Sequence, residues 1–205
     1  DRAVSRAPAP FYLAAALRCD VQCQYPLGLA SARAAYELDR AYWPLYTALA
    51  LGELRAGNYA RAAAAVKEGF FLDPYNIWLS NTRTLLAHFD RAYGMEAWGD
   101  IVFHAPAAAL PFYVNYLGPL LATATELFRD RYGTSPPVPV HVEVYGRQEH
   151  FSCRVLGLPD FPAQGVCFGP VIAVTVMPAY SGNHAISTWH EFAHVFTVAG
   201  TDYRI

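Results

Sequence analysis

The stretch Gly57–Pro74, GNYARAAAAVKEGFFLDP, determines the fold of the N-terminal half of this 205-residue chain. Gly57–Tyr59 is a turn between two helices, and Ala62 is a small residue that lets the helices cross closely. Leu72–Pro74 then stops the second helix, because proline cannot continue it. A helical hairpin is therefore predicted here.

The hairpin is repeated. Equivalent residues recur 34 positions apart, and a third, degraded copy is predicted to start at Ile77 and to fade by Trp98. This period and the small-residue crossing resemble tetratricopeptide repeats. Such repeats imply a groove for a peptide or partner protein, or else a spacer for the next domain, and both alternatives stay open. Two and a half copies need a cap, which the following domain would supply. The matched pairs include Pro10 and Pro44, Tyr12 and Tyr46, Leu17 and Leu51, Tyr25 and Tyr59, and Leu38 and Leu72.

Composition limits the possible partners. The chain is 54% apolar and 16% charged with a formal charge of -2, so it should fold, and no basic run is dense enough for nucleic acid or an anionic membrane. The apolar stretches are too short for a transmembrane segment. The N-terminus has neither an initiator Met nor a signal peptide, so the chain is interpreted as a processed or partial piece. A bacterial periplasmic or secreted location is favoured over the cytoplasm.

The four cysteines are too few for a disulfide scaffold. Cys19 and Cys23 are four residues apart and could share a helix face, but no further Cys or His cluster lies nearby, so packed thiols are predicted. Cys153 and Cys167 could pair, and the sequence leaves that open.

The pattern changes at Asp100. Strands are predicted at 101–104, 140–145, 165–169 and 171–176, with helical segments at 107–132 and around 148–155. The strict alternation over 140–145 predicts a half-buried strand with one wet face. The fold class is therefore α+β: helical hairpins over residues 1–98, followed by a small mixed sheet and a helix over residues 99–205.

That last helix carries the sequence TWHEFAHVFTV over Thr188–Val198. Residues 181–183 supply N-cap candidates, and Gly200 is predicted to follow the helix directly. His190 and His194 lie off the apolar stripe, so both imidazoles project from one face about a turn apart and can share one ion. The stripe itself consists of Ala185, Trp189, Phe192, Phe196 and Ala199.

Each residue of this motif has a chemical reason. Zinc takes neutral imidazole nitrogens and, at catalytic sites, leaves one position for water. Glu191 beside that water could take its proton and pass it to the leaving amine. The alternative is two histidines hydrogen-bonded at a helix–sheet interface. The other histidines lie in no ligand-like spacing and are predicted to be ordinary surface or core residues: His88, His104, His141, His150 and His184.

The segments Gly165–Ala173 and Thr188–Thr197, together with Val140–Tyr145, resemble the peptidase MA-like domain of bacterial proteins in which tetratricopeptide repeats accompany a gluzincin-type zinc peptidase. The resemblance implies that His190 and His194 bind zinc and that Glu191 is the general base. It also implies an edge strand on which an extended peptide can lie, formed by Gly165, Val166, Cys167, Phe168 and Gly169.

The third ligand of a gluzincin is a Glu on a later helix, eighteen or more residues beyond the second His, and this chain ends eleven residues after His194. Asp202 is the only later carboxylate and is predicted to be a surface turn residue. We therefore expect the third ligand to lie outside this chain, and residues 1–205 alone to bind zinc weakly and to be an incomplete catalytic unit.

Two functions remain. The favoured one is zinc-dependent hydrolysis of a peptide or protein, with Glu191 activating a zinc-bound water. The alternative is a non-catalytic scaffold subunit of a larger assembly that binds partners through the repeats and a degenerate peptidase fold. The aromatic content of 15% fits a partner-facing surface or a packed core equally well.

Overall fold

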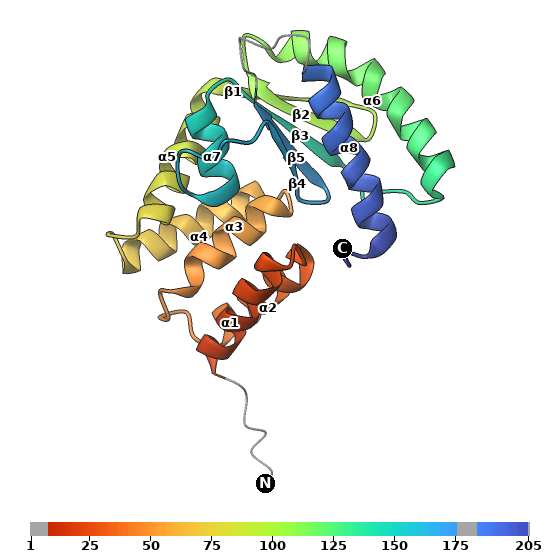
Figure 1. Cartoon of the computed structure of the whole chain (residues 1–205). Helices are drawn as coiled ribbons and strands as arrows, with labels where there is room; N and C mark the ends of the chain where they lie inside the picture. The colour runs from red at the N-terminus through yellow and green to blue at the C-terminus, as the bar shows by residue number, and fades with distance from the viewer. Residues whose placement is uncertain (1–7, 176–183, 205) are drawn as a thin grey trace.

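The computed structural model describes residues 8–175 and 184–204. Over these residues the chain is a mixed α+β protein with eight helices and one five-stranded sheet, which confirms the predicted class. The sheet is at the centre, and the N-terminal helices extend away from it (Figure 1).

Two helical hairpins form the N-terminal part. They consist of α1 (Ala9–Val21) with α2 (Tyr25–Leu38), and of α3 (Leu45–Arg55) with α4 (Tyr59–Leu72). The second helices begin and end 34 residues apart, as the repeat predicts. The chain turns at Gly57, whose φ of 77° is left-handed and favours glycine. Ala62 is fully buried, and Gly69 lies so close to Tyr46 that no Cβ would fit, which explains the small residues of α4.

The third copy contributes only one helix, α5 (Ile77–Ala92). Its predicted continuation to Trp98 is not helical, because Tyr93–Trp98 is strand β1 and pairs antiparallel with β2 (Ile101–Pro106) along its whole length. Cross-strand pairing has overridden the helical pattern of the repeat. The sheet therefore begins before the boundary predicted at residue 98.

The strand order is β1-β2-β3-β5-β4. β2, β3 (Val140–Tyr145) and β5 (Val171–Thr175) run parallel in the sheet interior, and each lies where the sequence predicts a strand. Val176, the last residue of the predicted strand 171–176, lies outside the described residues. β4 (Gly165–Cys167) pairs antiparallel with β5 and ends the sheet. Its prediction to Gly169 was too long, because Phe168 and Gly169 form the turn into β5.

Helices cover both faces of the sheet (Figure 1). α6 (Leu110–Tyr132) and α8 (His184–Thr201) pack on one face, where Val140, Val142 and Val144 belong to the main core. α5 and α7 (Gln148–Leu156) lie on the other. The expected wet face of β3 is wrong: Glu143 and Tyr145 alternate with the valines but are fully buried under the helices.

No helix among residues 8–175 and 184–204 is both long and apolar enough to cross a bilayer. All four cysteines are free thiols, so Cys153 and Cys167 do not form a disulfide. Cys153 and Cys167 are partly buried, whereas Cys23 is exposed and so is not the packed thiol that the sequence predicted.

Candidate active site

The two histidines of the HEFAH segment converge at one point. Both are exposed on α8, while Phe192 and Phe196 of the same helix are buried in the main core. His190 Nε2 and His194 Nε2 lie 3.1 Å apart. Two imidazole nitrogens on one tetrahedral zinc, with bonds of 2.0 to 2.1 Å, would lie roughly 3.3 Å apart. The pair therefore fits two ligands of one such ion.

Burial affects the protonation of this pair. His194 is partly enclosed, and burial together with His190 lowers the pKa of His194 below its usual value. The neutral form is the one that binds a metal. The lowered pKa of His194 therefore favours the form that can bind a cation.

Glu191 projects toward the edge of the sheet. A Cβ built on Gly165 would lie 2.5 Å from Glu191 Cγ and 2.8 Å from its Oε1, so the carboxylate arm occupies the space above this glycine. Burial raises the pKa of Glu191, and the neighbouring His190 partly offsets the rise. A carboxylate with a raised pKa is a stronger base than one in free solution.

β4 positions the glycine that Glu191 covers. Gly165, Val166 and Cys167 pair with Val174, Ala173 and Ile172 of β5, and no other described strand pairs with the opposite edge of β4. The start of the strand is tied to α8, since Ser187 Oγ donates to Gln164 Oε1 at 3.3 Å. The predicted edge beside the histidine helix is therefore present.

The far end of β4 is a tight turn. Phe168 N donates to Val171 O at 2.8 Å, and Gly169 has a left-handed φ of 104°. Phe168 is buried against Tyr25 of α2, with ring centroids 5.5 Å apart. Of the five residues expected to line an edge strand, three form the strand and two close the turn that joins it to β5.

The end of α8 differs from the prediction. Gly200 lies inside the helix, which runs to Thr201, and the chain turns at Asp202 and Tyr203, which have left-handed φ values of 50° and 59°. Tyr203 N donates to Val198 O at 3.1 Å and closes the helix end in place of the glycine. The predicted N-cap residues 181–183 lie outside the described residues.

No third ligand is evident in the part of the chain that the structure describes, where no group of three or more His, Cys, Asp or Glu side chains could hold a metal ion. Asp202 has a side chain that is 86% exposed and lies 3.8 Å from Arg204, so it is the surface turn residue that the sequence predicts.

Two other histidine pairs form only in the folded chain. His104 Nε2 lies 2.9 Å from His141 Nδ1, and the His88 and His150 rings have centroids 4.4 Å apart. Burial lowers the pKa of His104 to about 4, which keeps that imidazole neutral. His104 and His141 sit in adjacent strands, so their contact could not be read from a sequence separation of 37 residues.

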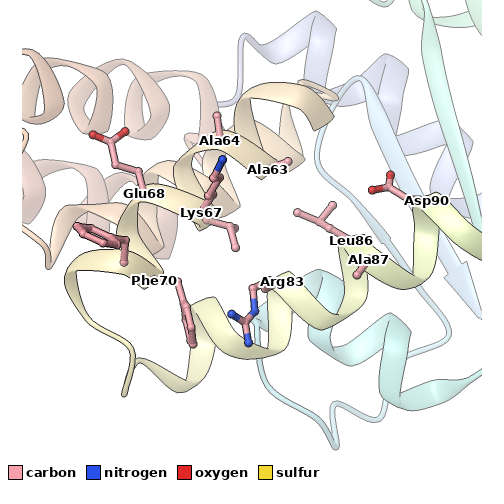
Figure 2. Close-up of a pocket in the computed structure, with 11 residues that line it drawn as sticks. Ala63, Ala64, Lys67, Glu68, Phe70, Arg83, Leu86, Ala87 and Asp90 are labelled. Atoms are coloured by element: carbon pink, nitrogen blue, oxygen red, sulfur yellow. The ribbon is translucent and has the colours of Figure 1, made fainter.

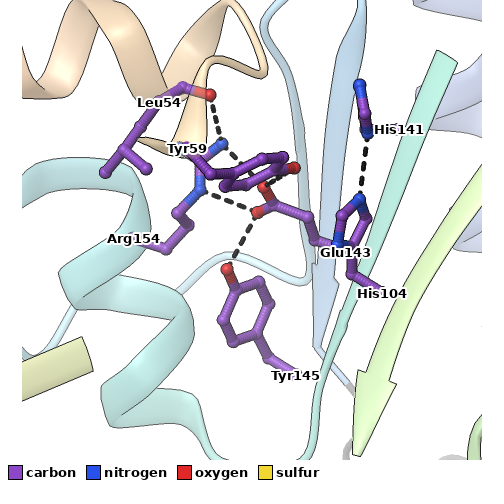
Figure 3. Close-up of polar contacts among 7 residues, drawn as sticks. All are labelled: Leu54, Tyr59, His104, His141, Glu143, Tyr145 and Arg154. Atoms are coloured by element: carbon purple, nitrogen blue, oxygen red, sulfur yellow. Dashed lines mark hydrogen bonds and ion pairs between the residues drawn. The ribbon is translucent and has the colours of Figure 1, made fainter. Parts of the chain in front are cut away.

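A buried polar cluster lies on the face of the sheet opposite α8, where the hairpins meet the sheet (Figure 3). Arg154 of α7 pairs with Glu143 of β3, with Arg154 Nε 2.7 Å from Glu143 Oε2. Tyr59 and Tyr145 donate to the same carboxylate at 2.7 Å and 2.8 Å, and Arg154 Nη2 donates to Leu54 O at 2.8 Å. The alternation of polar and apolar residues in β3 could have indicated this cluster, but the sequence assigned the polar face to solvent.

Comparisons of this chain with protein-family models, with curated proteins and with solved structures gave no match.

Proposed function

We propose that this chain contributes the zinc-binding helix and the substrate edge of a metallopeptidase. The observation that carries the proposal is the convergence of His190 Nε2 and His194 Nε2 at 3.1 Å, with Glu191 of the same helix against Gly165 at the sheet edge. When bound there, Zn²⁺ supplies a Lewis acid that lowers the pKa of water to near 7 and polarises a carbonyl. The third ligand is then a carboxylate that the described residues do not contain.

The chain's own residues have distinct roles in this proposal. Glu191 takes a proton from the attacking water and passes it to the leaving amine. The unpaired side of β4 offers main-chain N–H and C=O groups to an extended peptide, so recognition favours peptide backbone over particular side chains. Gly165 keeps this edge free of a side chain where Glu191 approaches it.

The fold supports the same proposal at a finer level. We assign the helical hairpins to the tetratricopeptide type because α2 and α4 repeat at 34 residues with the same first and last residue types. We assign β1–β5 with α8 to the N-terminal subdomain of a gluzincin because the helix that carries HEFAH packs beside an antiparallel edge strand. A periplasmic or secreted location stays a prediction.

Removal of one imidazole tests the metal site. We expect His190→Ala and His194→Ala each to lower zinc affinity by more than about 100-fold, because even loss of an outer hydrogen-bond partner costs 10- to 100-fold. In an assembly that supplies the third ligand, zinc-dependent hydrolysis of an unstructured peptide should disappear with the metal. His184→Ala is the matched control, since His184 begins the same helix outside the pair. Equal zinc affinity in all three variants would exclude the pair as ligands.

A methyl group on the edge strand tests the placement of Glu191. In Gly165→Ala the new Cβ would meet Glu191 Cγ, so the carboxylate has to move, and displacement by about 1 Å can cost on the order of 100-fold in rate. We expect slower hydrolysis with unchanged zinc content. Gly146→Ala is the control, because no atom lies within 4 Å of its added Cβ. Full activity of Gly165→Ala would show that the contact with Glu191 is not needed.

A further inference from the structure

An open groove lies between α4 and α5 (Figure 2). Its volume is about 820 Å³. The walls are mostly apolar, with Val66 and Phe70 on α4 and Leu86 and Ala87 on α5. A second cavity of about 390 Å³ shares Leu86 with it and extends the groove to β1.

The 34-residue repeat shows what is missing from this groove. The face of α3 that packs against α4 contains Leu49, Ala50 and Glu53, all buried. The equivalent residues of α5, 34 positions later, are Arg83, Thr84 and Ala87, and all three are exposed. Among the residues that the structure describes, no helix covers this face of α5 as α4 covers α3.

The equivalent cavity one repeat earlier is smaller because α4 closes one of its sides. That cavity, about 480 Å³, lies between α2 and α3 and contains Arg33 and Tyr36, the counterparts of Lys67 and Phe70. Its third wall is α4, which contributes Ala64 and Glu68. In the next copy the chain enters β1 at Tyr93, so the corresponding position of a helix stays open.

Large apolar side chains are exposed at one end of the groove. Phe71 is 85% exposed and lines the groove, and Tyr75 in the α4–α5 turn is 94% exposed. Exposed aromatic side chains beside an apolar groove are typical of a protein–protein contact.

The charges indicate which kind of helix would fit. Across the earlier cavity, Glu68 of α4 accepts a hydrogen bond from Tyr36 at 3.1 Å, and Arg33 pairs with Glu53 of α3 at 2.7 Å. In the open groove Lys67 takes the place of Arg33, and Arg83 packs over the Phe70 ring at 3.8 Å. Neither Lys67 nor Arg83 forms an ion pair within residues 8–175 and 184–204. Glu68 and Asp90 also line the groove, but Ala87 takes the place of Glu53, which pairs with Arg33 one repeat earlier. An acidic side chain on an incoming helix would give Lys67 the carboxylate that Ala87 does not supply.

We propose that the α4–α5 groove binds an amphipathic helix of a partner protein, with small apolar residues against Ala63, Leu86 and Ala87 and an acidic residue against Lys67 and Arg83. The bound helix takes the position that the second helix of a third repeat would occupy. This docking requires neither zinc nor hydrolysis, so its test is separate from the tests of the peptidase proposal.

The probe is a hydrocarbon-stapled, fluorescent peptide of residues 58–73, since α4 itself fills the equivalent position one repeat earlier and places Glu68 where the acid is expected. We expect saturable binding by fluorescence anisotropy. Lys67→Glu should weaken it by about 10-fold, and a peptide with Glu68→Lys should restore binding to that variant. Ala87→Trp should block binding to every peptide, because the exposed Ala87 lines the groove.

The controls separate this site from general effects. Arg129→Glu changes the same charge at an exposed position of α6 and should bind as the unaltered protein does. Absence of saturable binding, or equal binding by the Lys67→Glu, Ala87→Trp and Arg129→Glu variants, overturns the proposal. So does self-association that Lys67→Glu abolishes in sedimentation experiments, because a second copy of the chain would then occupy the groove.

Discussion

In an assembly that supplies the third zinc ligand, Glu191→Gln is expected to lower peptide hydrolysis by about 10²- to 10⁴-fold while zinc content stays unchanged. Gln has the shape of Glu and cannot accept a proton. His190 and His194 keep their convergence in this variant, since Glu191 is not part of their 3.1 Å contact. The loss should therefore appear in kcat, with little change in metal affinity.

Two further variants test whether the loss is specific to the carboxylate of Glu191. Glu191→Asp keeps a base but withdraws it by one methylene from the edge of β4, so we expect an intermediate rate. Glu126→Gln removes an exposed carboxylate on α6 and should leave the rate unchanged. Turnover by Glu191→Gln equal to that of the unaltered protein, with zinc content verified by metal analysis, would remove Glu191 from the mechanism.

The sequence predicted the local elements well because local periodicity determines them. Apolar spacing located α8, alternation located β3, and the 34-residue repeat located α4, which starts at Tyr59 inside the predicted turn and ends at Leu72. The HEFAH spacing also placed two imidazoles on one helix face, a consequence of helix geometry alone. These features require no knowledge of residues far along the chain.

The failures come from contacts between distant segments. The helical repeat pattern continued past Ala92, but pairing with β2 made Tyr93–Trp98 a strand. The polar face of β3 looked solvent-exposed, yet Tyr59 and Glu143 meet across 84 residues, and Arg154 reaches Leu54 across 100. Alternation shows that a face is polar, and it cannot show what covers that face.

This buried cluster has the largest predicted effect on stability. Arg154 and Glu143 have side chains that are 2% and 0% exposed, and the Glu143 carboxylate receives hydrogen bonds from Arg154, Tyr59 and Tyr145. Arg154 Nε is 2.7 Å from Glu143 Oε2, which makes an ion pair without hydrogen-bond geometry at Nε. Nη1 has no hydrogen-bond partner among the described residues. Nη2 therefore makes the two directional bonds of the guanidinium, to Glu143 and Leu54.

Arg154→Met is expected to destabilise the protein by about 3 to 5 kcal/mol, because it leaves the Glu143 charge buried without its counter-ion. Urea denaturation measures the loss. The double variant Arg154→Met, Glu143→Leu removes both charges, and we expect it to recover much of that stability, since replacing a whole buried pair by apolar residues is often nearly neutral. Burial raises the pKa of Tyr59 and Tyr145, so both remain uncharged phenols in every variant near neutral pH.

The exposed pair Arg147–Glu149 provides the control for this cycle. Its side chains are 65% and 62% exposed and lie 2.6 Å apart, so Arg147→Met should change stability by less than about 1 kcal/mol. Arg154 joins α7 to Leu54 at the end of α3, so Arg154→Met should also speed amide hydrogen exchange in α3 and α4 more than in α6. If Arg154→Met costs no more than Arg147→Met, the ion pair does not hold the hairpins on the sheet, and apolar packing around Phe151 and Phe168 does so instead.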